Sequence, residues 1–549
     1  MKSQCISFSE IPDVNRFFST FLENFPAVAA YYAHPPTVKG IDAAAREVRL
    51  EPEVRRKVVE VLREQNRAFG ADVSTKKNIE RLAAGAVAIV TGQQVGLFSG
   101  PAYTLYKAIS AFSGAEQLTE RGIEAVPVFW MATEDHDLAE VNHTLWNAGT
   151  GLRRYELPLR EGDEGKLVGS VQLGRAVDEC IAAAAESLSG AFAGEIAGLL
   201  RESYSSRETY GSSFGKLLTR LLARQGIVLL DPMDARLHRL AAPVLRKAVE
   251  KAQPLEEALL ERSRELEAHG FRAQVNVTRE MTLLFCQVQG RREPVHQRNG
   301  KLLIGNASFS PEEILAAIEE RPEDFSPNAL LRPVMQDMLL PTAAYIGGPA
   351  EVAYMAQAQI VYKQLLGRMP AIVPRASFTV VEPGMAELLS TYDLDIRDFF
   401  LGRQHLSAKM EERFLPPDLA NRFDRDRARL CGLLESYTDP VKRLDPTLLG
   451  VIESVKQNML DQFEKLRGKV SRVESLRTGL LDAQEEILLN SLYPNKRLQE
   501  RILCPLPLLA EYGLGFLEVL TRASGRLGSP DDSVCAQHHV LVLKQGEAN

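Results

Sequence analysis

Four consecutive ionisable residues, Glu134-Asp135-His136-Asp137, come just after the apolar segment 126–132, with only Thr133 between them. A near-continuous apolar run is typical of a parallel strand that is buried on both faces. Ligands of open α/β sheets bind just beyond the carboxyl ends of such strands, where catalysis is often performed. A neighbouring carboxylate orients an imidazole and raises its pKa. We therefore predict that His136 acts as a general base beside Asp135. Glu134 and Asp137 complete this predicted catalytic group.

The same cluster has two other interpretations. Imidazole and carboxylate side chains also bind zinc, iron or manganese, and Glu140 and His143 follow closely in the sequence. The spacing of His136 and His143 is not the HExxH spacing that places two histidines on one helix face, so we expect no tightly bound metal. The acids could instead cap a helix that begins near Ala139.

A glycine-rich segment, 91–101, follows the apolar stretch 86–90, which predicts a short buried strand. Pro101 suits the first turn of a helix and Ser99 suits its N-cap, so we predict a helix that ends near Thr119. With the apolar strand that precedes the charged cluster, these elements form a right-handed βαβ unit. Glycines let a ligand approach the backbone, and a helix N-terminus attracts anions. The segment is neither GxGxxG nor GxxxxGKS/T, and a tight turn without a ligand is the alternative.

Further strand and turn signals extend the predicted sheet. The apolar run 226–230 ends at Asp231 and precedes a helical stretch, 235–269. Asn299-Gly300, between the apolar runs 282–288 and 301–304, predicts a β-hairpin. Other predicted elements are a strand at 343–346 followed by a Gly-Gly-Pro turn and a helix, a strand at 371–373 that leads to the cation Arg375, a terminal edge strand at 538–543, and a mainly helical insertion at about 147–224.

After residue 383 the sequence becomes long, charged and helical. Apolar residues recur there every seven positions, a period that predicts a left-handed coiled coil. We expect this helix to pack on an earlier helix near 418–437 or on a second subunit. The seam consists of Ile452, Met459, Leu466, Val473, Leu480 and Ile487. The expected domains are a catalytic core at 1–383, a helical coiled-coil domain at 384–492 and a segment at 493–549 that returns to the core.

The composition is that of a globular protein and disfavours several function classes. A net charge of −7 argues against a general nucleic-acid binder. The sequence has no apolar run near the ~18 residues of a membrane span and no apolar signal core at its N-terminus. Six cysteines form no CxxC pair, which disfavours zinc binding and favours a reducing compartment. We expect a cytoplasmic protein that binds neither membranes nor nucleic acids.

Two long blocks of this sequence, 91–107 and 128–143, resemble the cysteine ligase family of bacillithiol biosynthesis, called BshC. The resemblance implies a Rossmann-like α/β core with a parallel sheet and helical insertions, and an α-helical coiled-coil domain that helps to form a homodimer. It also implies a reaction that joins the carboxyl group of cysteine to the amine of glucosaminyl-malate. Shorter matching blocks lie at 328–337, 341–354, 374–377 and 492–501, so the resemblance spans nearly the whole chain.

The resemblance also implies roles for individual residues. Amide formation from a free carboxylate needs an activated acyl group, so ATP with Mg²⁺ is the expected cosubstrate. Arg332 or Arg375 could clamp the malate carboxylates, or could pair with Asp337 or Glu351 instead. The expected substrate-binding residues are Gln93, Gln94, Ser99, Gly100, Lys107, Asn142, His143, Arg332, Gln336, Tyr345, Gly348, Glu351 and Arg375, although Lys107 could instead be exposed on its helix. The expected nucleotide-binding residues are Thr91, Gly92, Gly96, Tyr493 and Asn495.

The sequence departs from the family pattern at Val95 and Ser99, and Phe271-Arg272 replaces an expected aromatic–histidine pair. Three alternatives to the ligase are a nucleotide-dependent transferase of other specificity on the same core, a non-enzymatic coiled-coil scaffold, and a metallohydrolase built on His136 and His143. The concentration of charged residues at predicted strand ends favours the ligase over the scaffold.

Overall fold

The computed structural model describes residues 2–148, 151–479, 481–525 and 537–543. Its central sheet is parallel, in the order β13-β12-β2-β3-β6, which confirms the predicted α/β core. Along the chain, β3 and β6 are added on one side of β2, and β12 and β13 are then added on its other side. The strand order therefore reverses between β2 and β12. Ligands of such sheets bind at this switch point. The strands are Val87–Gln93 (β2), Ala125–Met131 (β3), Val228–Leu230 (β6), Thr342–Gly347 (β12) and Ala371–Pro374 (β13).

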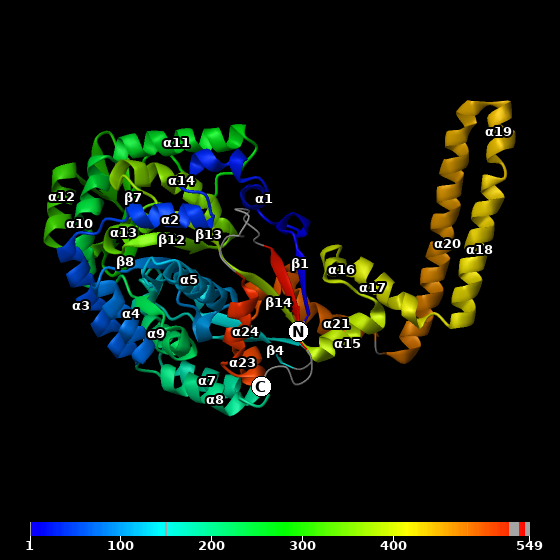
Figure 1. Cartoon of the computed structure of the whole chain (residues 1–549), viewed down its shortest axis with the longest axis horizontal. Coiled ribbons are helices and arrows are strands. Elements are labelled where there is room, and N and C mark those ends of the chain that lie inside the picture. The colour runs from blue at the N-terminus through cyan, green and yellow to red at the C-terminus, as the bar shows by residue number, and fades with distance from the viewer. Residues whose placement is uncertain (1, 149–150, 480, 526–536, 544–549) are drawn as a thin grey trace.

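Helices cover both faces of this sheet (Figure 1). Successive side chains of a strand point to opposite faces. Val90 and Val128 therefore pack in a core with α3, α10 and α14, whereas Ile89 packs with α2 and α5. Because helices bury both faces of the sheet, the sequences of its strands are nearly continuous apolar runs. The helices are Val38–Glu47 (α2), Pro52–Phe69 (α3), Val73–Ala83 (α4), Tyr103–Glu120 (α5), Ala235–Glu250 (α10), Arg332–Leu339 (α13) and Pro349–Leu365 (α14).

The predicted βαβ unit runs from β2 through α5 to β3, but its turn differs from the prediction. Phe98 and Ser99 have φ values of 53° and 74°, in the left-handed region. A Cβ added at Gly96 would lie 3.0 Å from the Cα of Gly100, so any larger residue would push the two backbone segments apart. The N-cap of α5 is Ala102, which provides no side-chain cap. The prediction that Ser99 caps this helix is therefore wrong, because the tight turn ends before the helix begins.

Two insertions interrupt the parallel sheet. The first lies between β3 and β6 and carries a hairpin and helices. The second contains an antiparallel sheet in the order β10-β9-β8-β7-β11. The first comprises Leu138–Val141 (α6), His143–Ala148 (β4), Gly151–Glu156 (β5), Ala176–Ser187 (α7), Ala193–Ser203 (α8) and Tyr210–Leu221 (α9). The second follows Ala252–Ala268 (α11) and comprises Met281–Val288 (β7), Arg291–Arg298 (β8), Lys301–Ile304 (β9), Ala307–Phe309 (β10), Pro311–Glu320 (α12) and Phe325–Pro327 (β11).

The predicted hairpin turn at Asn299-Gly300 is present, but its first strand is β8 rather than the 282–288 stretch. Asn299 and Gly300 have φ values of 51° and 74°, which suits a two-residue hairpin turn. The 282–288 stretch belongs to β7, which pairs with β8 across a second turn at Gln289-Gly290. Strand β8 has no apolar signature because Val295 is its one buried residue.

The last described strand, β15 (His538–Val542), lies in the middle of a three-stranded sheet. It pairs antiparallel with β1 (Lys2–Ile6) and parallel with β14 (Ser377–Val381). The prediction of an edge strand is therefore wrong, because both of its partners come from distant parts of the sequence. Short helices beside this region are Gln499–Ile502 (α22), Leu506–Tyr512 (α23) and Phe516–Ala523 (α24).

A helical arm projects from the rest of the molecule (Figure 1). Along it, α18 and α20 pack on each other: the rings of Phe423 and Phe463 lie 5.3 Å apart, and Arg427 forms an ion pair with Glu464 at 3.0 Å. The predicted partner helix therefore belongs to the same chain. None of the helices that the structure describes is both long and apolar enough to cross a membrane. Helix Arg16–Glu23 (α1) packs on α14 of the core. The arm and its base comprise Pro383–Tyr392 (α15), Ile396–Phe400 (α16), Arg403–Glu411 (α17), Pro417–Glu435 (α18), Thr438–Leu444 (α19), Leu449–Thr478 (α20) and Leu481–Leu492 (α21).

The seven-residue seam of α20 does not face α18. Met459, Leu466 and Val473 are 45%, 52% and 56% exposed, whereas Phe463 contacts α18. Leu480 lies outside the described residues. The period therefore predicted a coiled-coil helix correctly, but the contact with α18 uses a neighbouring face.

Candidate functional site

A cavity of about 770 Å³ opens at the switch point between β2 and β12. Residues at or just beyond the carboxyl ends of β2, β3, β6 and β12 line it, together with the first turn of α14 and residues of the β7–β8 hairpin. The start of the glycine-rich segment and part of the charged cluster therefore share one cavity. The predicted site residues that line it are Gly92, Gln93, Gln94, Lys107, Glu134, Asp135, Arg332, Tyr345, Gly348, Glu351 and Arg375.

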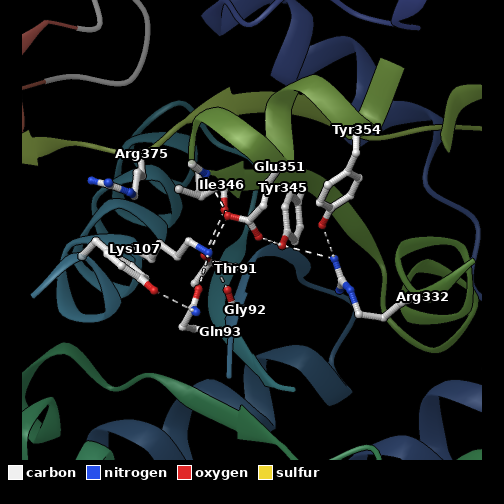
Figure 2. A network of polar contacts seen from close by, with 12 residues as sticks. Thr91, Gly92, Gln93, Lys107, Arg332, Tyr345, Ile346, Glu351, Tyr354 and Arg375 are labelled. Atoms are coloured by element: carbon white, nitrogen blue, oxygen red, sulfur yellow. Dashed lines mark hydrogen bonds and ion pairs between the residues drawn. The ribbon is translucent and has the colours of Figure 1, made fainter. Parts of the chain in front are cut away.

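Lys107 and Glu351 form a buried ion pair in this cavity (Figure 2). Lys107 is 3% exposed, and its Nζ also donates to Gln93 Oε1 at 2.8 Å. Glu351 accepts hydrogen bonds from the Gly348 N–H at 2.8 Å and the Tyr345 hydroxyl at 2.6 Å. Burial alone would raise the pKa of the Glu351 carboxyl, but Lys107 and these donors hold it below its ordinary value. Glu351 is therefore ionised, and the alternative that Lys107 is surface-exposed is wrong.

Arg332, in the first turn of α13, is a cation held by neutral groups. Its Nη1 donates to Gln336 Oε1 at 2.9 Å, and its Nη2 donates to the hydroxyls of Tyr345 and Tyr354 at 3.3 and 3.1 Å (Figure 2). Within the part of the chain that the structure describes, no carboxylate forms an ion pair with it, so neither Asp337 nor Glu351 is its partner. Its positive charge is available to an anionic ligand in the cavity.

Arg375, at the end of β13, is instead neutralised by Glu500 of α22. Its Nη1 and Nη2 donate to the two carboxylate oxygens at 2.9 and 2.6 Å, and both side chains are nearly fully buried. Glu500 also accepts from the Ser377 hydroxyl at 2.9 Å. The predicted alternatives, Asp337 and Glu351, are therefore not the partners of Arg375. Glu500 lies 125 residues away in the sequence, which explains why this pair was not predicted.

The carboxyl end of β3 makes another part of the cavity acidic. Gln94 Nε2 donates to Asp135 Oδ2 and to Glu140 Oε2, each at 2.7 Å. The other oxygen of Asp135 accepts the backbone N–H of His136 at 2.7 Å. Gln94 thus joins the glycine-rich segment directly to the charged cluster.

His136 lies beside the cavity rather than among its lining residues. Its side chain is 43% exposed, and its Nδ1 lies 3.2 Å from Arg292 Nη1 and 3.5 Å from Asp135 Oδ1. Arg292 comes from β8 and stacks on the Phe285 ring at 3.8 Å. Burial lowers the pKa of Arg292, and the charges of Glu134 and Asp135 oppose this effect. Sequence analysis missed Arg292 because it missed its strand. The base role of His136 stays a prediction.

Glu134 pairs with His238, a second residue that sequence analysis missed. His238 Nε2 lies 2.8 Å from Glu134 Oε1, and their side chains are 2% and 9% exposed. Burial opposes protonation of His238, but the charge of Glu134 and its hydrogen bond leave the pKa of His238 above its ordinary value. His238 lies near the start of α10, and a histidine so soon after the β6 strand end was the available signal.

Other predicted site residues lie outside the cavity lining and stabilise local structure. Asp137 caps α6 by accepting the Glu140 N–H at 3.2 Å, as the capping interpretation predicts. Thr91 donates to a carbonyl of β12 at 2.9 Å, and Asn142 donates to the carbonyl that follows β5 at 2.8 Å. Within the described residues, no group of three or more His, Cys, Asp or Glu could hold a metal ion. The others outside the lining are Gly96, Ser99, Gly100, His143, Gln336, Tyr493 and Asn495, whose binding roles stay predictions.

Two family models together match nearly the whole chain. Residues 1–376 match the model described as "Bacillithiol biosynthesis BshC, N-terminal Rossmann-like domain". Residues 378–528 match "Bacillithiol biosynthesis BshC, C-terminal coiled-coil domain". The Rossmann-like and coiled-coil predictions are therefore confirmed.

Full-length relatives carry the same family name. A protein of Koribacter versatilis named "Putative cysteine ligase BshC" is 38% identical over 98% of this chain and 100% of its own. A protein of Solibacter usitatus with the same name is 37% identical over 99% of this chain and 100% of its own. Among solved structures, a methionyl-tRNA synthetase of Mycobacterium tuberculosis aligns over 82% of this chain and 97% of its own. Its sequence identity of 11% and TM-score of 0.25 are too low to support an inference.

Proposed function

Because this chain belongs to the BshC family of bacillithiol biosynthesis, we propose that it is a cytoplasmic ligase that joins the carboxyl group of cysteine to the amine of glucosaminyl-malate. The observation that supports this most directly is one cavity that contains both an unneutralised cation, Arg332, and the acids Glu134 and Asp135. Glucosaminyl-malate carries carboxylates on its malate and an amine on its sugar. The charges of the cavity and of this substrate are complementary.

We propose that ATP with Mg²⁺ supplies the activated acyl group of cysteine. Lys107, Arg375 and Arg501 line the cavity together with the first turn of α14. Such cations and a helix N-terminus suit phosphate or carboxylate groups. Glu351 and Glu500 hold two of these cations in place, so a ligand would meet donors that are already oriented. Of the predicted nucleotide-binding residues, Gly92 lies in this lining.

A reconstituted reaction tests the proposed function. The purified protein is incubated with cysteine, glucosaminyl-malate, ATP and Mg²⁺, and the products are followed by mass spectrometry. We expect a thiol whose mass equals the two substrates minus one water, and no such product without ATP. Product formation without any nucleotide would contradict the ATP proposal. Absence of the product under all conditions, despite measured binding of both substrates, would contradict the ligase proposal.

We expect replacement of Arg332 by glutamine to weaken the binding of glucosaminyl-malate about 10- to 100-fold. A hydrogen bond to a charged group contributes about 1.5–3 kcal/mol, and the variant loses that group. Steady-state kinetics should show the loss in KM rather than in kcat. Arg298→Gln, at an exposed arginine of β8, is the matched control. An unchanged KM for glucosaminyl-malate in Arg332→Gln would show that another group binds the malate.

We also propose that the exposed stripe of α20 binds a second copy of this chain. The stripe lies on the face of α20 next to the one that contacts α18, runs along most of the helix and consists of Val451, Val455, Met459, Leu466 and Val473, all of which are 43–56% exposed. Contiguous apolar surface of this kind is typical of an interaction site. The seven-residue spacing within the stripe suits a helix of a partner arm.

The double substitution Met459→Asp and Leu466→Asp is expected to convert a dimer into a monomer. Two carboxylates in an apolar helix contact would be desolvated without partners. Light scattering after gel filtration measures the mass. Val73→Asp, at an apolar residue of α4 that is 80% exposed, is the control and should leave the mass unchanged. A wild-type protein that is monomeric at micromolar concentration would contradict this assignment.

A further inference from the structure

The cavity contains one carboxylate that is held from behind by an imidazole. Glu134 lines the cavity, and its Oε1 contacts the Nε2 of His238, which comes from α10 and is almost fully buried. Among the other lining carboxylates, Asp135 has a longer imidazole contact, with the half-exposed His136 at 3.5 Å. Gln94 donates to Asp135 and Glu140, and Lys107 and Tyr345 contact Glu351.

The contacts of His136 disfavour it as a proton acceptor. Its Nδ1 faces a guanidinium nitrogen of Arg292 at 3.2 Å. The same nitrogen lies 3.5 Å from Asp135 Oδ1, so both neighbours of Nδ1 belong to the protein. His136 is also absent from the residues that line the cavity.

The direction of the hydrogen bond between His238 and Glu134 is also defined. An ionised carboxylate only accepts hydrogen bonds, so the Nε2 of His238 carries the proton of this 2.8 Å contact. Burial disfavours the charged ring, whereas Glu134 and a hydrogen bond to the Pro322 backbone favour it and leave the pKa of His238 raised. The hydrogen bond from His238 fixes the orientation of the Glu134 carboxylate toward the cavity.

We propose that Glu134 accepts the proton of the substrate amine and that His238 is the positioning residue that holds it. This proposal rests on the proposed function. An N–H bond of the ammonium breaks as an O–H bond forms on Glu134. The freed electron pair of the nitrogen attacks the activated acyl carbon, and the acyl leaving group departs with its bonding electrons. Glu134 then releases the proton to water at the cavity mouth.

The charges around this pair determine the sign of the expected pH effect. Arg292 of β8 brings positive charge toward Glu134, whereas Asp135 and Asp231 bring negative charge. Asp234 and Glu323 face His238 itself. A hydrogen-bond donor at position 238 stabilises the ionised form of Glu134. Its removal should therefore move the acidic limb of the kcat/KM profile to higher pH.

Kinetics of four variants test the assignment. Glu134→Gln should lower kcat about 100-fold or more, the typical contribution of a general base. His238→Phe should move the acidic limb of the kcat/KM profile to higher pH, and His238→Gln, which keeps an N–H donor, should keep most of the wild-type kcat and a profile close to that of the wild type. Glu161→Gln, at an exposed glutamate, is the control. A kcat within threefold of wild type in Glu134→Gln, or an unmoved acidic limb in His238→Phe, would overturn the proposal.

A binding measurement separates this proposal from the proposed function. Calorimetric titration of glucosaminyl-malate at pH 7 requires no turnover. Glu134→Gln should weaken binding at least 10-fold, because it removes the anion that meets the ammonium group. Equal affinities of the wild type and Glu134→Gln would overturn the role of Glu134, even if ligation is observed. Weaker binding in the variant without ligation by the wild type would support Glu134 as the amine-binding group and would contradict the ligase proposal instead.

Discussion

Replacement of Lys107 by methionine is expected to lower the free energy of unfolding of the core by about 3–5 kcal/mol, the usual cost of removing one partner from a buried ion pair. Methionine would fill the apolar part of the lysine site but would leave Glu351 without its counter-charge. The remaining donors to Glu351, the Gly348 N–H and the Tyr345 hydroxyl, carry no net charge. Urea unfolding followed by circular dichroism measures the change.

A double-mutant cycle gives this prediction its control. Addition of Glu351→Gln to Lys107→Met should recover most of the lost stability, because it removes the uncompensated charge. Lys77→Met changes an exposed lysine of α4 and should change stability by less than about 0.5 kcal/mol. If the losses of the two single variants simply add in the double variant, the two side chains are not coupled and the ion pair does not stabilise the core.

The βαβ unit and the position of the cavity could be predicted because both depend on local signals. Apolar runs mark the parallel strands, and charged residues that follow them mark the carboxyl ends where ligands bind. This rule predicts that Gln94 and Asp135 share one cavity, and in the structure Gln94 Nε2 lies 2.7 Å from Asp135 Oδ2. It could not show that the glycine turn itself points inward. Phe98 is fully buried there, and its N–H donates to the Tyr204 hydroxyl at 2.9 Å.

The site residues that were missed come from elements whose positions depend on tertiary structure. Arg292 lies on a polar strand without an apolar pattern, and Glu500 lies on a four-residue helix. His238 carries a local signal, but its contact with Glu134 depends on how α10 packs against the sheet. The seam of α20 shows the same limit, because period seven indicates a coiled-coil helix without showing which face meets which partner.

A buried polar chain connects the C-terminal strand to the cavity. His538 of β15 is fully buried, and its ring nitrogens contact the hydroxyls of Ser377 at 2.7 Å and Thr379 at 2.8 Å. Ser377 also donates to Glu500, which holds Arg375 at the cavity. Burial lowers the pKa of His538 to about 4, against the opposing charge of Glu500. The hydroxyls satisfy the neutral ring, and the surroundings disfavour an imidazolium.

Acidification from pH 6.5 to 4 is therefore expected to lower the free energy of unfolding by about 3 kcal/mol through His538 alone. The unfolded state takes up a proton near the ordinary histidine pKa of 6.5, whereas the folded state does so only near 4. Stability is thus full above pH 6.5 and falls by about 1.4 kcal/mol per pH unit below it. Glu500 also has a lowered pKa, but its contribution to stability is lost only as the pH falls below 4.5.

Urea unfolding of the wild type and His538→Gln at pH 7, 6 and 5 separates the contribution of His538 from that of Glu500. The variant should lose about 2 kcal/mol less between pH 7 and 5, whereas His296→Gln, at an exposed histidine, should follow the wild type. Parallel stability curves for the wild type and His538→Gln would show that His538 is protonated as readily in the folded state as in the unfolded state.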